Sequence, residues 1–113
     1  MIRLLNVMMI ALGLVACQAQ NNAIQIETES VKSMAVEDSV RIIDVRTPAE
    51  VAAGYIDGTD YFINKNGSSF EESIAELDTA LTYIVYCRSG MRSTSALNYM
   101  SKTGFTNLYE LKG

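Results

Sequence analysis

The sequence has no histidine, one proline and only two cysteines among its 113 residues. The lack of histidine excludes a Cys–His catalytic pair and any metal site that uses imidazole ligands. The two cysteines, Cys17 and Cys87, are too far apart in sequence to form a zinc-binding pattern. We therefore expect neither a metal nor a cofactor, and any cysteine chemistry has to work without a histidine.

Basic residues are also few, with nine Lys and Arg against thirteen Asp and Glu and a net charge of −4. There is no basic run, so binding of nucleic acid has no electrostatic support and is not expected. Apolar residues make up 49 % of the chain, which is enough for a hydrophobic core. The length fits one domain and not two.

The N-terminal segment has the pattern of a secretory signal. Residues 1–3 include a basic residue, and residues 4–16 are almost wholly apolar but too few to span a membrane comfortably. The segment ends in Leu14-Val15-Ala16-Cys17, which resembles the bacterial lipobox, where the cysteine is lipidated and becomes the new N-terminus. We expect a signal peptide at 1–16 and a lipid anchor on Cys17, with the protein in the bacterial cell envelope, facing the periplasm or the outer surface. The alternative is an ordinary cleaved signal with a chance cysteine.

After a polar tether at 17–23, patterns typical of strands and helices alternate through a domain at 24–113. This alternation predicts an α/β domain with a mainly parallel central sheet flanked by helices on both faces. Strands are expected at 24–27, 40–45, 61–64, 83–86 and 105–109, and helices at 29–35, from Pro48 to Gly54, at 69–78 and from Thr94 to about Lys102.

Two of the predicted helices have recognisable N-terminal signals. Thr28 is expected to cap the first helix. Thr47, Pro48 and Glu50 form the pattern of a capping box, in which Thr47 is the N-cap and Glu50 bonds back to it.

The loop Cys87-Arg88-Ser89-Gly90-Met91-Arg92-Ser93 joins a strand to a helix. A thiol there faces backbone N–H groups and the positive end of a helix, which favour the thiolate. Arg88 and Arg92 add positive charge, so the loop predicts attack by a thiolate on an anionic substrate. The alternative is that Cys87 is a buried and inert small side chain.

Three segments together resemble the single-domain rhodaneses: Ile43-Asp44-Val45-Arg46-Thr47-Pro48-Ala49-Glu50, the loop from Tyr86 to Ser93, and Gly104-Phe105-Thr106-Asn107-Leu108-Tyr109-Glu110-Leu111-Lys112-Gly113. They follow the order and approximate spacing of that family. The resemblance implies a three-layer rhodanese-like domain and transfer of a sulfane sulfur through a cysteine persulfide. The donor would be thiosulfate or a similar small anion, and the acceptor a thiol or cyanide.

The resemblance also implies roles for individual residues. Cys87 would carry the persulfide. The loop that binds the substrate would consist of Arg88, Ser89, Gly90, Met91 and Arg92. Asp44, Arg46 and Ser93 would give structural support, with Asp44 accepting backbone hydrogen bonds or pairing with an arginine.

The sequence departs from the family at two places. Gly54-Tyr55-Ile56-Asp57-Gly58-Thr59 stands where many members have Gly-His-Ile-Pro-Gly-Ala. The family usually continues past the last segment with a second glycine, an apolar residue and a closing helix, whereas this sequence ends at Gly113. We therefore expect the closing helix to be missing, so that one face of the sheet is less covered or the sequence is a fragment.

Two other functions fit the same loop. Cysteine phosphatases place five residues between the cysteine and the arginine, whereas four separate Cys87 from Arg92 here, and no aspartate general acid can be identified. The shorter loop favours a sulfur atom over a phosphoryl group. The other alternative is a non-catalytic binding or redox-sensing module at the membrane, with Cys87 as its redox thiol.

Overall fold

A computed structural model describes residues 23–112. The predicted signal peptide and the predicted lipidation site at Cys17 lie outside these residues, as does most of the predicted tether. Among the described residues, no helix is long and apolar enough to cross a membrane.

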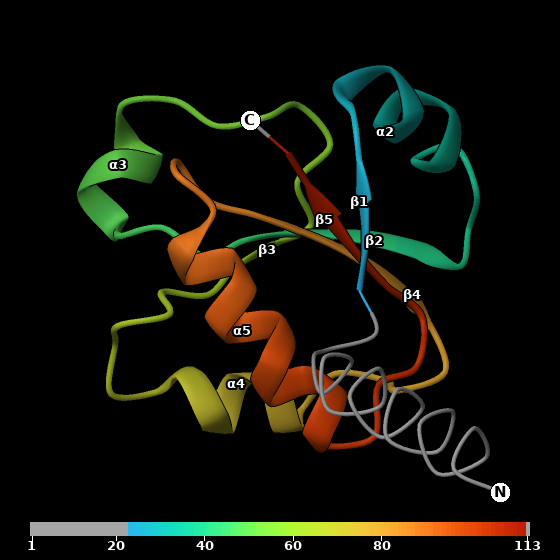
Figure 1. Ribbon diagram of the computed structural model, residues 1–113. Helices are drawn as coiled ribbons and strands as arrows, with labels where there is room; N and C mark the ends of the chain where they lie inside the picture. Colours follow the sequence, from blue (N-terminus) through green and yellow to red (C-terminus); the bar gives the residue numbers. More distant parts are fainter. Residues whose placement is uncertain (1–22, 113) are drawn as a thin grey trace, which may run out of the picture.

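Five parallel strands form one sheet, and the predicted α/β architecture is confirmed (Figure 1). The spatial order of the strands is β1-β5-β4-β2-β3. The bounds are β1 (Ile24–Ile26), β2 (Val40–Asp44), β3 (Tyr61–Phe62), β4 (Thr82–Tyr86) and β5 (Leu108–Leu111). The short β3 is an edge strand, and β4 is the central one.

Within residues 23–112, four helices connect the strands and cover both faces of the sheet. In Figure 1, α4 and α5 lie next to each other, whereas α2 lies apart from them. The bounds are α2 (Thr28–Met34), α3 (Pro48–Ala52), α4 (Phe70–Ala75) and α5 (Met91–Lys102).

The core is divided into two parts by the sheet, because successive side chains of a strand point to opposite faces. Ile43 and Val85 pack with residues of α4 and α5 on one face. Ile42 and Ile84 pack with Val31 of α2 on the other. Burial on both faces explains why β2 and β4 have nearly continuous apolar sequences.

The predicted capping box is confirmed. The backbone N–H of Glu50 donates to the Thr47 hydroxyl over 3.3 Å, and the Glu50 carboxylate accepts from the backbone N–H of Thr47 over 3.2 Å. The cap fixes the start of α3 directly after β2. By contrast, Thr28 does not cap α2: it is the first residue of that helix, and the N-cap is Glu27, whose carbonyl accepts from Ser30 and Val31.

The last strand begins three residues later than expected, at Leu108. Phe105 is buried, as its apolar side chain suggests, but its backbone N–H donates to the carbonyl of Met100 in α5 over 3.2 Å. Gly104, with φ of 105°, turns the chain there. This hydrogen bond is typical of the turn that caps a helix C-terminus, so Phe105 belongs to the cap of α5 and not to the strand.

The site lies where the direction of the strand connections reverses. β2 and β4 are neighbours with Asp44 opposite Tyr86, but the chain leaves β2 toward β3 on one side and leaves β4 toward β5 on the other. In open α/β sheets, ligands bind at such a switch point, beyond the carboxyl ends of the strands. Arg46 and Cys87 follow these two ends.

Candidate active site

The loop after β4 holds Cys87 against the start of α5. Gly90 is the N-cap of α5 and has φ of 94°, a left-handed conformation that glycine adopts without a steric penalty. The helix starts at Met91, three residues earlier than the expected start at Thr94. Arg92 and Ser93 therefore belong to its first turn, whose N–H groups have no partner within the helix.

Several hydrogen-bond donors of this turn converge on the sulfur of Cys87. The backbone N–H groups of Gly90 and Ser93 donate to Sγ over 3.0 and 3.3 Å, and Ser93 Oγ lies 3.4 Å from Sγ. Burial by itself raises the pKa of the thiol, but these contacts and the backbone N–H of Arg92 outweigh it, so the pKa of Cys87 lies below its ordinary value. A lowered pKa makes the thiolate, which is the nucleophile, more available.

Cys87 opens into a cavity of about 480 Å³, which we call the thiol pocket. Only 8 % of Cys87 is exposed, so a reagent has to enter this cavity to reach the sulfur. The pocket is lined by residues that follow β2, residues of α3 and the connection after it, and the end of β4: Arg46, Glu50, Ala53, Gly54, Tyr55, Ile56, Tyr86, Cys87 and Arg88.

Arg46 lines the pocket and is held by Asp44, so the predicted pairing of Asp44 with an arginine is confirmed. The fully buried Asp44 carboxylate accepts from Arg46 Nη2 over 2.8 Å and from the Arg46 backbone N–H over 2.9 Å. Arg46 also donates to the carbonyl of Gly54 over 2.6 Å and lies over the Tyr86 ring, 5.8 Å from its centroid. The hydrogen bonds that Arg46 donates to Asp44 raise the pKa of Arg46 and fix its charge in place.

Arg92 is paired with Glu50, which the sequence showed only as part of the capping box. The two terminal guanidinium nitrogens of Arg92, Nη1 and Nη2, donate to the two carboxylate oxygens of Glu50 over 2.6 and 3.0 Å. The bonds from Arg92, followed by those from Thr47, lower the pKa of Glu50 to about 2. Sequence reasoning assigned Arg92 to the substrate, whereas the structure places its planar donor face on Glu50 and ties α5 to α3.

Arg88 is the remaining cation of the thiol pocket. Its side chain is exposed, and within residues 23–112 it has no ion-pair partner. Arg46 and Arg92 are each balanced by a carboxylate, so the uncompensated positive charge of the pocket rests on Arg88. This charge attracts anions to an otherwise acidic protein.

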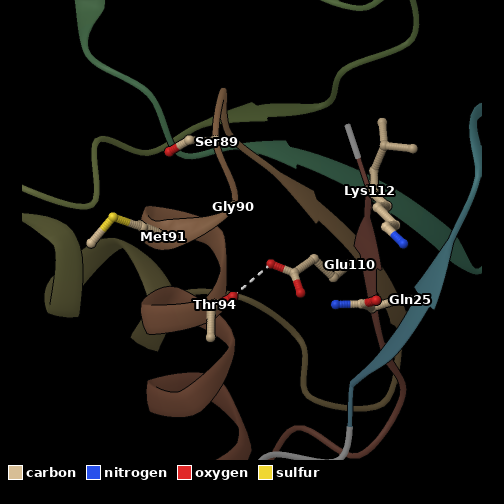
Figure 2. A pocket seen from close by; sticks show the side chains of 8 residues that line it. Gln25, Ser89, Gly90, Met91, Thr94, Glu110 and Lys112 are labelled. Carbon is tan, nitrogen blue, oxygen red and sulfur yellow. Dashed lines mark hydrogen bonds between the residues drawn. The ribbon is translucent and has the colours of Figure 1, made fainter.

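The other predicted loop residues face a second cavity of about 550 Å³ (Figure 2). Ser89, Gly90 and Met91 line it, together with Gln25, Thr94, Glu110, Leu111 and Lys112; we call it the Glu110 cavity. Met91 is 80 % exposed and lines the Glu110 cavity, not the thiol pocket, so its contact with the substrate stays a prediction. The early start of α5 turns Met91 outward at the first helical position.

Glu110 is a second residue of the site that sequence reasoning missed. Its side chain is buried, and its carboxylate oxygen Oε2 accepts from Ser93 Oγ over 2.7 Å and from Thr94 Oγ1 over 2.8 Å. β5 ends at Leu111, two residues beyond the expected end at 109, so Glu110 lies within the strand, opposite Val85 of β4. The predicted strand stopped at 109 and left Glu110 outside it; a strand extended to Leu111 would have placed this carboxylate in the sheet and would have been the signal.

Comparisons with known proteins agree with this fold. A family model described as a rhodanese-like domain matches residues 27–113. The thiosulfate sulfurtransferase GlpE of Pseudomonas aeruginosa is 32 % identical over 89 residues, which cover 79 % of this chain and 77 % of that protein. A sulfurtransferase of Allochromatium vinosum is 30 % identical over 90 residues, which cover 79 % of this chain and 81 % of that protein.

A solved structure shows the same architecture. The crystal structure of a rhodanese-related protein from Thermoplasma volcanium matches with a TM-score of 0.68 and 26 % identity, and the match covers 80 % of this chain and 84 % of that one. The parallel sheet and its flanking helices are therefore shared with a protein of similar sequence.

Proposed function

Because the chain belongs to the rhodanese-like domain family, we propose that it is a sulfurtransferase that carries a sulfane sulfur as a persulfide on Cys87. The observation that carries this proposal is the convergence of the Gly90 and Ser93 N–H groups on Sγ, at the bottom of a pocket with an uncompensated positive charge. This environment favours a thiolate, and its positive charge attracts a small anion into the pocket.

The proposed reaction is a double displacement. The Cys87 thiolate attacks the outer sulfur of thiosulfate, the S–S bond of the donor breaks, and sulfite leaves with the electron pair. The acceptor, a thiolate or cyanide, then attacks the outer sulfur of the Cys87 persulfide. The Cys87–sulfur bond breaks and the thiolate is restored, so neither a metal nor a cofactor is required.

The residues of the pocket have separate tasks in this proposal. The N–H groups that bond Sγ are placed to stabilise the anionic persulfide, as an oxyanion hole stabilises a negative oxygen. Arg88 attracts the donor and binds its sulfonate oxygens through charge-assisted hydrogen bonds. The ion pairs Arg46–Asp44 and Arg92–Glu50 hold the walls of the pocket.

The test is to measure two products side by side for the wild type and Cys87→Ser. With thiosulfate and cyanide, the wild type is expected to release thiocyanate, and the variant is expected to release none. With an aryl phosphate, neither is expected to release phosphate. Phosphate release that depends on Cys87 would favour the phosphatase. A wild type that is folded, releases neither product and only forms a sulfenic acid or mixed disulfide would favour the redox module.

A further inference from the structure

A continuous chain of contacts leads from Cys87 to a buried carboxylate. Sγ lies 3.4 Å from Ser93 Oγ, and Ser93 Oγ lies 2.7 Å from Glu110 Oε2. Ser93 is fully buried and Glu110 is only 8 % exposed. Three elements, the end of β4, the first turn of α5 and β5, contribute one residue each.

The number of protons on these groups limits how the chain can be arranged. A serine hydroxyl has one proton to donate, whereas an ionised carboxylate can only accept. The Ser93 hydroxyl has three polar neighbours, of which Glu110 is the nearest; the others are Sγ and the carbonyl of Gly90 at 3.1 Å. While Ser93 donates to ionised Glu110, it can only accept from Cys87, and this arrangement suits the thiol.

The opposite arrangement suits the thiolate. If Glu110 is protonated, it donates to Ser93, and the Ser93 proton is then available to the sulfur. The two arrangements differ by the shift of one proton along each of two hydrogen bonds, and each holds a single negative charge across the three residues.

The two ends of the chain open on different sides of the loop. Cys87 faces the thiol pocket, whereas Glu110 lines the Glu110 cavity together with Thr94, whose hydroxyl also bonds Oε2 (Figure 2). A substrate that fills the thiol pocket therefore leaves the carboxylate end of the chain uncovered.

We infer that Glu110 is a positioning residue that accepts, through Ser93, the proton that Cys87 gives up when it becomes a thiolate. Sγ–H transfers its proton to Ser93 Oγ, and Ser93 transfers its own proton to Glu110 Oε2. The thiol becomes a thiolate, the carboxylate becomes a carboxylic acid, and the net charge does not change. The reverse shift returns the proton to Sγ, which restores the thiol of Cys87 and the ionised carboxylate of Glu110.

Other charged groups surround the two ends. They are Arg46 after β2, Glu50 of α3, Arg88 of the loop and Arg92 of α5 around Cys87, and Lys112, which follows β5, beside Glu110. Glu50, with a pKa of about 2, and Arg46 and Arg92, whose pKa values are raised, keep their charges across the neutral range. All of these groups are present in every variant below, so differences between variants do not come from them.

The inference is tested by the pH profile of Cys87 alkylation by iodoacetamide in the 113-residue chain, followed by the mass of the peptide that contains Cys87. Two groups that share one charge titrate in two steps. The wild type is expected to show a plateau of partial reactivity below neutral pH and a second rise at higher pH. Glu110→Gln is expected to show a single step, with a midpoint about one pH unit below the second step of the wild type.

Two variants serve as controls for Glu110→Gln. Thr94→Val removes the other hydrogen bond to Glu110 Oε2 but leaves the path through Ser93, so it is expected to keep two steps. Glu110→Asp keeps a carboxylate and is expected to restore the plateau, whereas a merely structural effect of Glu110 would not depend on the charge of its replacement. A single-step profile in the wild type would overturn the inference even if Glu110→Gln failed to fold. Identical profiles for the wild type and Glu110→Gln would do so as well.

This inference rests on the proposed function only in requiring that Cys87 act as a thiolate. The alkylation experiment uses no sulfur donor, so the two can fail separately. A two-step profile in a protein that accepts no sulfur would contradict the sulfurtransferase proposal alone, and an active sulfurtransferase with a one-step profile would contradict only the role of Glu110.

Discussion

Glu50 joins two tasks that the sequence does not show together. It closes the capping box of α3 and accepts both hydrogen bonds from the guanidinium of Arg92. Because its pKa is lowered from 4.5 to about 2, its charge is favoured in the folded state. The stabilisation is complete above pH 4.5 and is lost as the pH falls through 2.

We therefore expect Glu50→Gln to be less stable than the wild type at pH 7, and the difference to shrink as the pH is lowered from about 4.5 to about 2. Glutamine keeps an oxygen for the cap but loses the charge that holds Arg92. Urea unfolding at a series of pH values measures the difference. Glu71→Gln, at an exposed position of α4, is the control and should show no such pattern. A gap between the wild type and Glu50→Gln that stayed constant down to pH 2 would contradict the assignment.

Among single residues, those encoded by local pattern were predictable. Cys87 and Arg88 follow a strand and precede a glycine, and Asp44 ends the neighbouring strand, so their meeting follows from parallel strand order. Glu50 and Glu110 were missed because their partners, Arg92 and Ser93, are distant in sequence. Each required a boundary to be placed correctly: the start of α5 for Arg92 and the end of β5 for Glu110.

Among the elements, the loop from Cys87 to α5 depends most on one backbone conformation. Gly90 has φ of 94°, and a Cβ at this position would meet no atom within 4 Å, so only the backbone angle disfavours another residue. A residue with a side chain in the left-handed region costs roughly 1–2 kcal/mol.

Gly90→Ala is expected to lose roughly 1–2 kcal/mol of stability if it keeps this backbone angle. If the backbone angle changes instead, the N–H of residue 90 turns away from Sγ. A lost bond to a charged group costs about 1.5–3 kcal/mol, so Cys87 alkylation at neutral pH should slow by about tenfold or more. Gly58→Ala is the matched control: Gly58 has φ of 90° and also has room for a Cβ, but it donates nothing to the sulfur. Equal alkylation rates in the two variants would show that Gly90 does not position the thiol.

Most elements could be predicted from periodicity, because β2 and β4 are buried on both faces and α4 buries one stripe. The residues at which helices and strands begin and end were less predictable. The observed start of α5 differs from the predicted one because Gly90 serves as N-cap without a side-chain hydrogen bond. The observed start of β5 differs because the backbone of Phe105 hydrogen-bonds to the end of α5. Both boundaries are set by backbone hydrogen bonds, which depend little on residue type and are therefore hard to predict from the sequence.

For the whole molecule, we propose that the domain is held at a membrane surface by a lipid on Cys17. The motif Leu14-Val15-Ala16-Cys17 after a basic and apolar leader motivates this proposal. In a bacterial host, the chain is expected to partition into the detergent phase and to carry lipid on Cys17. Cys17→Ala should abolish both, and Cys87→Ser, which removes the other cysteine, should abolish neither. Unchanged cleavage and membrane association in Cys17→Ala would reject the anchor.

The intact mass of the protein shows whether Cys87 holds a transferable sulfur. After treatment with thiosulfate or an organic polysulfide, the wild type and Cys17→Ser should gain the mass of one sulfur atom, located on Cys87 by peptide mapping, and cyanide should remove it. Cys87→Ser should gain none, because a serine hydroxyl is not ionised near neutral pH and holds no sulfane sulfur. A folded wild type that gains no sulfur on Cys87 from any such donor would contradict the account.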